Sequence, residues 1–110
     1  MPAMTRERLP NRRAAETFGL EIGGQHYTCT AGRFPDGRLA EIFLSNGKAG
    51  SDADTSARDA AVVASIALQA GADLDVIRHS LMRDSRGKAS GPLGAALDYL
   101  AALQSKPPTA

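Results

Sequence analysis

The sequence contains no tryptophan, and only 5% of its 110 residues are aromatic. Aromatic side chains are the surfaces on which single-stranded nucleic acids stack their bases, so a chain this poor in them lacks such a platform. Its formal net charge is only +1, whereas proteins that hold nucleic acids through their phosphates are strongly basic. We therefore do not expect a nucleic-acid partner.

Cysteine is nearly absent too, because Cys29 is the only one. A single cysteine forms neither an internal disulfide nor the cysteine pairs of a structural zinc site, which favours a reducing, cytoplasmic location. Cys29 lies on the apolar side of its segment, where packing is the expected role. His26 and His79 have no further ligand at metal-binding spacing, and Glu41 has no evident partner as a base. We assign no catalytic residue, metal or cofactor.

Long hydrophobic runs are also missing. No apolar stretch approaches the ~20 residues of a membrane span, and the charged N-terminus is not followed by the apolar stretch of a signal peptide. With 43% hydrophobic and 23% charged residues, the composition is that of one ordinary globular domain. We divide the chain into a basic extended N-terminal arm (1–13), a single domain (14–104) and a flexible tail (105–110). The arm is either a solvated tail or an interface.

Alternating residues predict an antiparallel hairpin. The apolar members of the two alternating segments are Phe18, Leu20 and Ile22, then Tyr27, Cys29 and Ala31. This period of two is typical of half-buried strands, and Gly23-Gly24 between them suits a two-residue turn. Such a turn places Tyr27 opposite Leu20 and Cys29 opposite Phe18, so both apolar sets share one face.

A second turn, from Phe34 to Arg38, leads into a third strand from Leu39 to about Ser45. We expect Leu39 and Phe43 on one face of this strand, and Ile42 and Leu44 on the other. A strand that is apolar on both faces is usually central or covered twice. The sequence leaves its register open. A loop of three residues and a loop of four residues would place each side chain of the strand on opposite faces of the sheet.

Helices are predicted for the remainder. The segment from about Thr55 to Ala70 is apolar nearly all round, which is typical of a buried helix, and Gly71 suits the position just past its end. A shorter helix follows Asp73, and a last one opens at Ser90 to Pro92. The predicted fold is α+β, a three-stranded antiparallel meander followed by three helices packed on the sheet. Three helices hardly cover both faces of such a sheet, so we expect a homodimer.

The segment between the third strand and the long helix contains the residue types of an anion-binding loop. It matches neither the Walker A pattern nor G-x-G-x-x-G, but it combines free helix amides with glycines and a lysine. The candidate residues for binding a nucleotide or phosphate are Asn46, Gly47, Lys48, Gly50, Ser51 and Arg58. The alternative is a capped turn, because Asp52 and Asp54 stabilise the helix dipole and repel a phosphate.

Several of these short motifs together resemble the TSCPD domain. They are Asp36-Gly37-Arg38, Glu41-Ile42-Phe43, Gly47-Lys48 with Gly50-Ser51, and Leu68-Gln69 before Gly71. The resemblance extends from about Leu9 to Met82. The TSCPD domain is found near the C-terminus of adenosylcobalamin-dependent ribonucleotide reductases and also as small stand-alone proteins.

The resemblance implies a link to ribonucleotide reduction but not the reaction itself. The reductase chemistry lies in a large barrel with radical and substrate cysteines, and cobalamin is expected only in the full-length enzymes. One expectation is a small non-catalytic binding or accessory module whose loop 46–51 contacts a nucleotide or phosphate. The alternative is a subunit or regulator of a cobalamin-dependent ribonucleotide reductase. It would act through protein contacts of the basic arm and the second face of the sheet.

Overall fold

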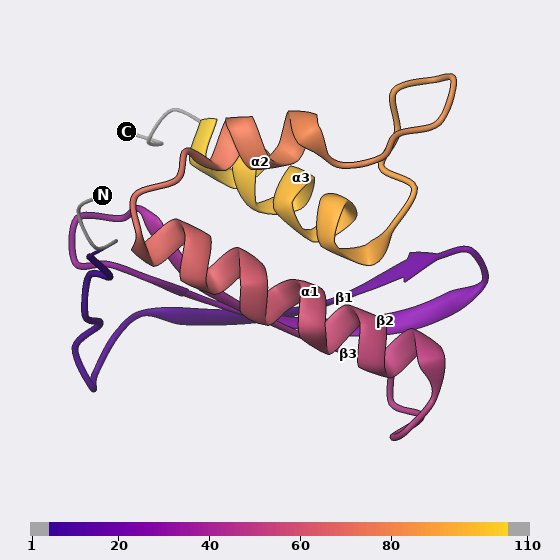
Figure 1. The fold of residues 1–110 in the computed structure, drawn as a ribbon, viewed down its shortest axis with the longest axis horizontal. Coiled ribbons are helices and arrows are strands. Elements are labelled where there is room, and N and C mark those ends of the chain that lie inside the picture. The colour runs from indigo at the N-terminus through magenta and orange to yellow at the C-terminus, as the bar shows by residue number, and fades with distance from the viewer. Residues whose placement is uncertain (1–4, 106–110) are drawn as a thin grey trace.

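A computed structural model describes residues 5–105, which form one antiparallel sheet and three helices (Figure 1). The elements are β1 (Ala15–Ile22), β2 (Gln25–Arg33), β3 (Leu39–Ser45), α1 (Asp52–Gln69), α2 (Leu74–Ser80) and α3 (Pro92–Ser105). The strand order is β1-β2-β3, so the predicted α+β meander followed by three helices is confirmed. Residues 1–4 of the predicted arm and 106–110 of the predicted tail lie outside the described residues. Within 5–105, no helix is both long and apolar enough to cross a membrane.

The first hairpin has the predicted register. Phe18 pairs with Cys29 and Leu20 with Tyr27, and the turn glycines Gly23 and Gly24 have φ values of 57° and 76°. Positive φ at both turn positions is the reason why two glycines suit this turn. The shared apolar face of β1 and β2 is the one that the helices cover, since Tyr27 and Cys29 belong to the core.

Strand β3 departs from the prediction in two ways. It is an edge strand rather than a central one, and Leu39 lies in the same core as Ile42 and Leu44. The cause is an irregularity in the ladder between Gly32 and Arg33. Arg33 pairs with Leu39 but Gly32 pairs with Glu41, which leaves one extra residue on β3. A bulge of this kind interrupts the alternation of side chains along the strand, so Leu39 before it and Ile42 after it face the same side of the sheet. Phe43 therefore remains without an apolar partner on the opposite face, where it is 54% exposed.

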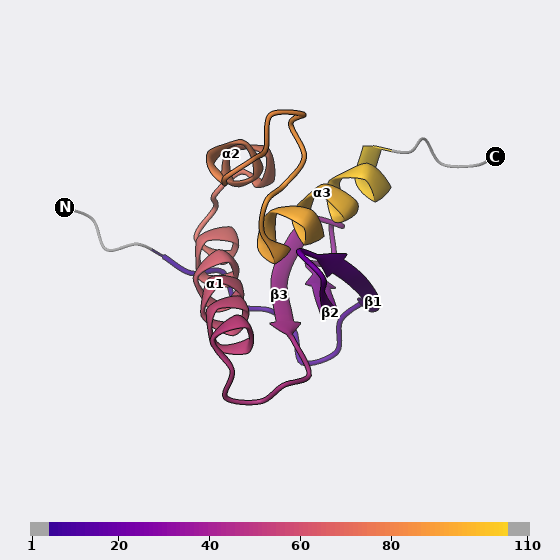
Figure 2. The ribbon, with the colours of Figure 1, turned by 90° about the vertical axis from the view of Figure 1, so that its right-hand side faces the viewer.

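Helix α1 lies along the free edge of β3 (Figure 2). The Ser65 hydroxyl accepts a hydrogen bond from Ile42 N (2.9 Å) and donates one to Ile42 O (3.0 Å), and Gln69 Nε2 donates to Ala40 O (3.0 Å). An unpaired strand edge presents backbone donors and acceptors that attract further strands. Here polar side chains of α1 satisfy several of these groups, so the helix closes this edge of the sheet.

The buried side of α1 is narrower than predicted. The helix begins at Asp52 and buries a stripe made of Asp54, Ala57, Ala61, Ala64, Ser65, Leu68 and Gln69. Mostly small residues on this stripe allow the helix backbone to lie close to β3. The prediction of burial nearly all round is wrong, because Val62 and Val63 are 54% and 67% exposed. Gly71 just beyond the helix has φ 99°, as expected for a glycine that follows a helix end.

Helices α2 and α3 pack against each other, and α3 covers β1 (Figure 2). Leu97 and Leu100 of α3 are fully buried in the core, and the ring of Tyr99 lies 4.2 Å from that of Phe18. As predicted, Asp73 caps α2, since its side chain accepts from Asp75 N. Helices α2 and α3 lie on one side of the sheet, α1 lies along its β3 edge and joins the same core, and among the described residues no helix covers the other face.

The segment before β1 makes specific contacts although it forms neither helix nor strand. Glu7 N donates to Gln69 O (2.7 Å), and Arg6 Nε donates to the Gln69 side chain. Farther along, Arg13 Nε donates to Glu41 Oε1 (2.6 Å). Residues 5–13 therefore run beside the end of α1 and reach the uncovered face of the sheet at Glu41. The proposed boundary at residue 13 stays a prediction.

Candidate functional site

The predicted site residues Asn46 to Ser51 form the connection between β3 and α1, and Arg58 lies in the second turn of α1. Gly47 and Gly50 have φ values of 85° and 81°, a conformation that costs a residue with a Cβ about 1 kcal/mol or more. The glycines are thus required by the path of the loop. They are equally consistent with a binding loop and with a plain turn.

The first turn of α1 is capped by the chain itself. Ser51 Oγ accepts from Asp54 N (3.1 Å), while Asp54 Oδ1 accepts from Asn46 N (2.9 Å). The Asp54 carboxylate also accepts from Arg58 Nε (2.8 Å). The hydrogen bond from Asn46 N, and after it that from Arg58, lowers the pKa of Asp54. The anion nearest the start of this helix is therefore the protein's own carboxylate, and it is buried.

Asn46 anchors the loop to the hairpin. Its side chain is buried, and Nδ2 donates to Gln25 Oε1 (3.1 Å) and to His26 O (3.3 Å) at the start of β2. Its backbone N–H is the one that Asp54 binds. These contacts make Asn46 a structural residue of the loop, a role that the sequence did not reveal.

Two cations of the predicted site remain accessible. The Lys48 side chain is exposed, and among residues 5–105 it has no hydrogen-bond or ion-pair partner. The Arg58 side chain is 59% exposed although its Nε binds Asp54. Both groups face solvent, and the charge of Arg58 is already shared with Asp54.

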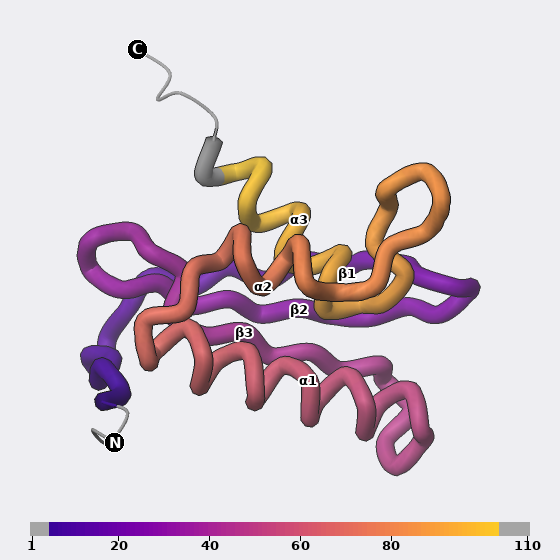
Figure 3. The backbone as a smooth tube through the Cα atoms, turned by 45° about the horizontal axis from the view of Figure 1, so that its top comes forward, coloured from indigo at the N-terminus to yellow at the C-terminus, as the bar shows by residue number. Residues whose placement is uncertain are grey.

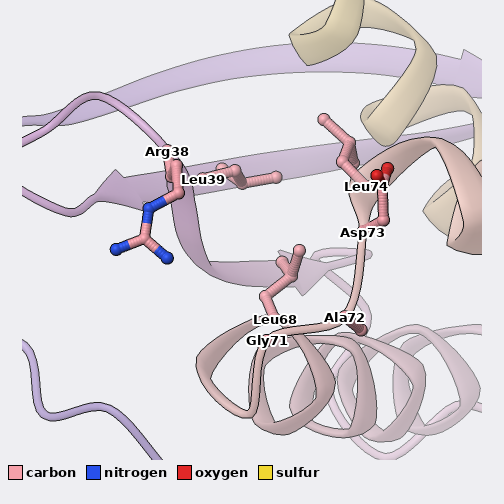
Figure 4. Close-up of a pocket in the computed structure, with 7 residues that line it drawn as sticks. All are labelled: Arg38, Leu39, Leu68, Gly71, Ala72, Asp73 and Leu74. Carbon is pink, nitrogen blue, oxygen red and sulfur yellow. The ribbon is translucent and has the colours of Figure 1, made fainter.

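A pocket of about 320 Å³ lies at the opposite end of α1. Figure 4 shows Arg38 on one side of it and Asp73 with Leu74 on the other, with Leu39 and Leu68 between them. The remaining lining residues are Gly71 and Ala72. Sequence reasoning missed this pocket, although Asp36-Gly37-Arg38 and the residues before Gly71 were among the motifs that it singled out.

The charge of Arg38 at this pocket is already matched by carboxylates. Its Nε donates to Asp36 Oδ2 (2.7 Å), and its Nη2 donates to Glu7 Oε1 (3.1 Å). The guanidinium carbon lies 4.6 Å from the centre of the Phe34 ring. These hydrogen bonds, that to Asp36 first, raise the pKa of Arg38. The pocket is mainly apolar, and its arginine serves the turn and the N-terminal segment.

The uncovered face of the sheet contains Phe43 and a set of polar side chains. Thr17 and Thr30 share a hydrogen bond of 3.0 Å across β1 and β2. Glu41, which the sequence left without a partner, is held by Arg13 and lies over Gly32. A Cβ at Gly32 would approach the Glu41 carboxylate oxygen to 2.7 Å. We call this surface the open face; it consists of Thr17, Gly19, Glu21, His26, Thr28, Thr30, Glu41, Phe43 and Ser45.

Among residues 5–105, the Cys29 thiol is unsuited to act as a nucleophile and no group of side chains is arranged to hold a metal. Cys29 is fully buried, and burial, with a smaller contribution from Glu16, raises the pKa of its thiol to about 12. A protonated, inaccessible thiol is a poor nucleophile. His26 is exposed and lies 3.9 Å from Glu21. In the part of the chain that the structure describes, no three His, Cys, Asp or Glu side chains are grouped as metal ligands.

Comparisons with known proteins give a consistent result. A family model for the TSCPD domain matches residues 4–104. The chain is 37% identical over 70 residues to a vitamin B12-dependent ribonucleotide reductase of Agrobacterium fabrum, which covers 64% of this chain and 6% of the relative. It is 38% identical over 72 residues to the protein of that name from Rhodopirellula baltica, which covers 66% and 7%. The chain thus spans only 6–7% of these relatives. No solved structure matches it.

Proposed function

The chain belongs to the TSCPD domain family, and from this premise we propose that it is a small non-catalytic binding module that acts by contacting another protein. The first partner to test is a vitamin B12-dependent ribonucleotide reductase, because the relatives carry that name. The match covers a small part of each relative, so the module is an accessory to that reaction and does not perform it.

The observation that carries this proposal is the open face of the sheet. It combines a single large exposed aromatic residue, Phe43, with hydroxyl groups such as those of Thr17 and Thr30. Transient protein interfaces are about as polar as the rest of the surface, and their binding energy is concentrated in a few aromatic or arginine anchors. Phe43 is such an anchor, and Arg13 at the edge of the face adds a second one.

The test is binding of the purified protein to the ribonucleotide reductase from the same organism, measured by calorimetry. We expect Phe43→Ala to weaken binding about tenfold or more, because a truncated aromatic hot spot costs at least about 1.4 kcal/mol. The control is Val76→Ala, which truncates an exposed apolar side chain on α2, away from the open face. Equal affinities of the parent and of Phe43→Ala would remove the open face as the interface. Lack of any binding would remove this reductase as the partner.

A second candidate is contact with a nucleotide or phosphate at the loop 46–51. It is favoured by the exposed, unpaired side chain of Lys48 beside a helix N-terminus, where anions are commonly bound. Gly47 lets the backbone pass close to that position, and Arg58 adds a second cation; the Ser51 N–H is already bonded to Lys48 O (3.1 Å).

Thermal unfolding with millimolar nucleotides tests this site, since a ligand of the folded state raises the melting temperature. Lys48→Ala should abolish the shift and leave the free protein unchanged. Arg12→Ala removes the same charge from the N-terminal segment and should retain the shift. If the parent shows no shift, the loop acts only as a capped turn.

A further inference from the structure

An apolar groove lies between α1 and the pair formed by α2 and α3. It consists of two adjoining hollows of about 310 and 400 Å³, which share Ala60, Leu81 and Leu93 as lining residues. The other apolar side chains along it include Val63, Ala67, Ile77 and Met82. Most of the lining residues of this helical groove lie on α1 on one side, and on α2, α3 and the segment between them on the other; Figure 3 shows the backbones of these helices.

Large apolar side chains that line the helical groove are exposed to solvent. Val63 is 67% exposed and Met82 is 80% exposed, and both line the hollows. Contiguous apolar surface on a small protein marks an interaction site. The open face, by contrast, has one exposed apolar side chain among polar ones. The helical groove therefore has the character of a stable interface, whose centre is apolar and depleted in charge.

Charged residues of opposite sign flank the two sides of the helical groove. Asp52 and Asp59 lie along α1, and Asp59 is itself a lining residue. Arg86 and Lys88 lie in the loop 83–89, which projects beyond the end of α2 (Figure 3). All four side chains are exposed, and within residues 5–105 none of them forms a hydrogen bond or an ion pair.

The projecting loop is held in a defined shape. Its ends pair as an antiparallel bridge between Arg83 and Ala89, and Asp98 of α3 binds the Arg83 guanidinium through both carboxylate oxygens at 2.8 Å. At its tip, Asp84 Oδ1 accepts from the backbone N–H groups of Arg86 (2.9 Å) and Lys88 (3.0 Å). A surface that is already ordered loses less conformational entropy on binding.

We propose that the helical groove is a homodimer interface in which a second copy of this chain docks about a two-fold axis parallel to the groove. In a two-fold dimer the same patch faces itself, so it must be self-complementary. With an axis along the groove, Val63 and Met82 of the two copies meet at the centre. The acidic side of each copy, with Asp59, then faces the basic side of the other, with Lys88. This interface leaves the open face of the sheet accessible to a different partner.

The first test is the mass in solution, measured by light scattering and by sedimentation at tens of micromolar protein. We expect twice the 11.5 kDa mass of the chain. Val63→Glu places a charge in the groove and should give a monomer. Its neighbour Val62 is similarly exposed but does not line the groove, so Val62→Glu is the matched control and should stay dimeric. Circular dichroism confirms that both variants are folded.

Charge reversal is the second test. Lys88→Glu and Asp59→Lys should each raise the dimer dissociation constant about tenfold or more, and the double variant should recover most of the loss. A monomeric parent overturns the proposal, as does a dimer that survives Val63→Glu. A dimer that is lost in Phe43→Ala instead places the two-fold contact on the open face and also overturns it. None of these results depends on whether the reductase binds.

Discussion

Replacing Ser65 by alanine tests whether α1 stabilises the protein by closing the edge of β3. The Ser65 hydroxyl is bonded to both the N–H and the C=O of Ile42, at 2.9 and 3.0 Å, and Ile42 is fully buried. The alanine variant therefore leaves two backbone groups of one residue without a partner, in a place that water does not reach.

The expected loss of stability follows from these two groups. A buried polar group that loses its partner costs about 1–3 kcal/mol, and the better helix propensity of alanine returns about 0.5 kcal/mol. Two such groups cost about 2–6 kcal/mol together, so we expect a net loss of about 1.5–5.5 kcal/mol, which is a large fraction of the roughly 5–15 kcal/mol that stabilise a domain. With a slope of about 1–3 kcal/mol per molar urea, the unfolding midpoint should fall by about 0.5 M or more.

Urea unfolding followed by circular dichroism at low micromolar concentration measures this loss. Ser56→Ala on the same helix is the control, because Ser56 is exposed and forms no side-chain hydrogen bond within the described residues; its midpoint should not fall. Amide hydrogen exchange at Ile42 should accelerate in Ser65→Ala. If the free energies of unfolding of Ser65→Ala and the parent differ by less than about 0.5 kcal/mol, the bonds between α1 and the strand edge do not stabilise the fold.

Three further predictions use other features of the molecule. Gly71→Ala should cost about 1 kcal/mol, because Gly71 has φ 99° and a Cβ is strained there; an unchanged urea midpoint would contradict this. Asp98 has a lowered pKa, chiefly through its hydrogen bond from Arg83 and then through that from Arg78. A lowered folded-state pKa stabilises the protein above the unfolded value of about 3.9, and this contribution disappears as the pH falls through the folded value. Asp98→Asn should thus be less stable than the parent at neutral pH, with a difference that shrinks below about pH 4; a constant difference would exclude this linkage. Finally, the buried Cys29 thiol, with its pKa of about 12, should react with a disulfide reagent only at the rate of unfolding; immediate reaction of the native protein would show that it is accessible.

The register of the first hairpin could be predicted because the residues that determine it are close together in the sequence. The turn at Gly23-Gly24 and the alternation on both sides of it favour the same register, and the observed pairs of Phe18 with Cys29 and Leu20 with Tyr27 agree. The faces of β3 could not be predicted in the same way. The bulge beside Arg33 brings Leu39 into the same core as Ile42 and Leu44, and no pattern within the strand indicates it.

The polar residues of α1 show the same limit at longer range. Ser65 and Gln69 looked like ordinary members of an apolar helix, and nothing in the sequence indicated that they bind a strand 23 to 29 positions earlier. For the loop, a capped turn with the acidic residues Asp52 and Asp54 was foreseen as an alternative. The cap by Ser51 and the hydrogen bond of Asp54 with Asn46, which fixes the loop to the strand, were not. Both contacts depend on the tertiary placement of helix against strand.

The contacts between α1 and β3 also fix the number of residues between successive contacts, because the spacing along the helix matches the spacing along the strand. One helical turn of four residues, such as Ser65 to Gln69, advances about 6 Å, and two strand residues, such as Ile42 to Ala40, advance about 6.6 Å. The helix therefore takes the place of a fourth strand, with one side-chain contact to the β3 backbone in each turn. Inserting a single residue between Ser65 and Gln69 would rotate the Gln69 side chain by about 100° around the helix axis and move it away from the strand. We expect this interval to resist insertions and deletions even though the residues on the outer side of the same turn can vary.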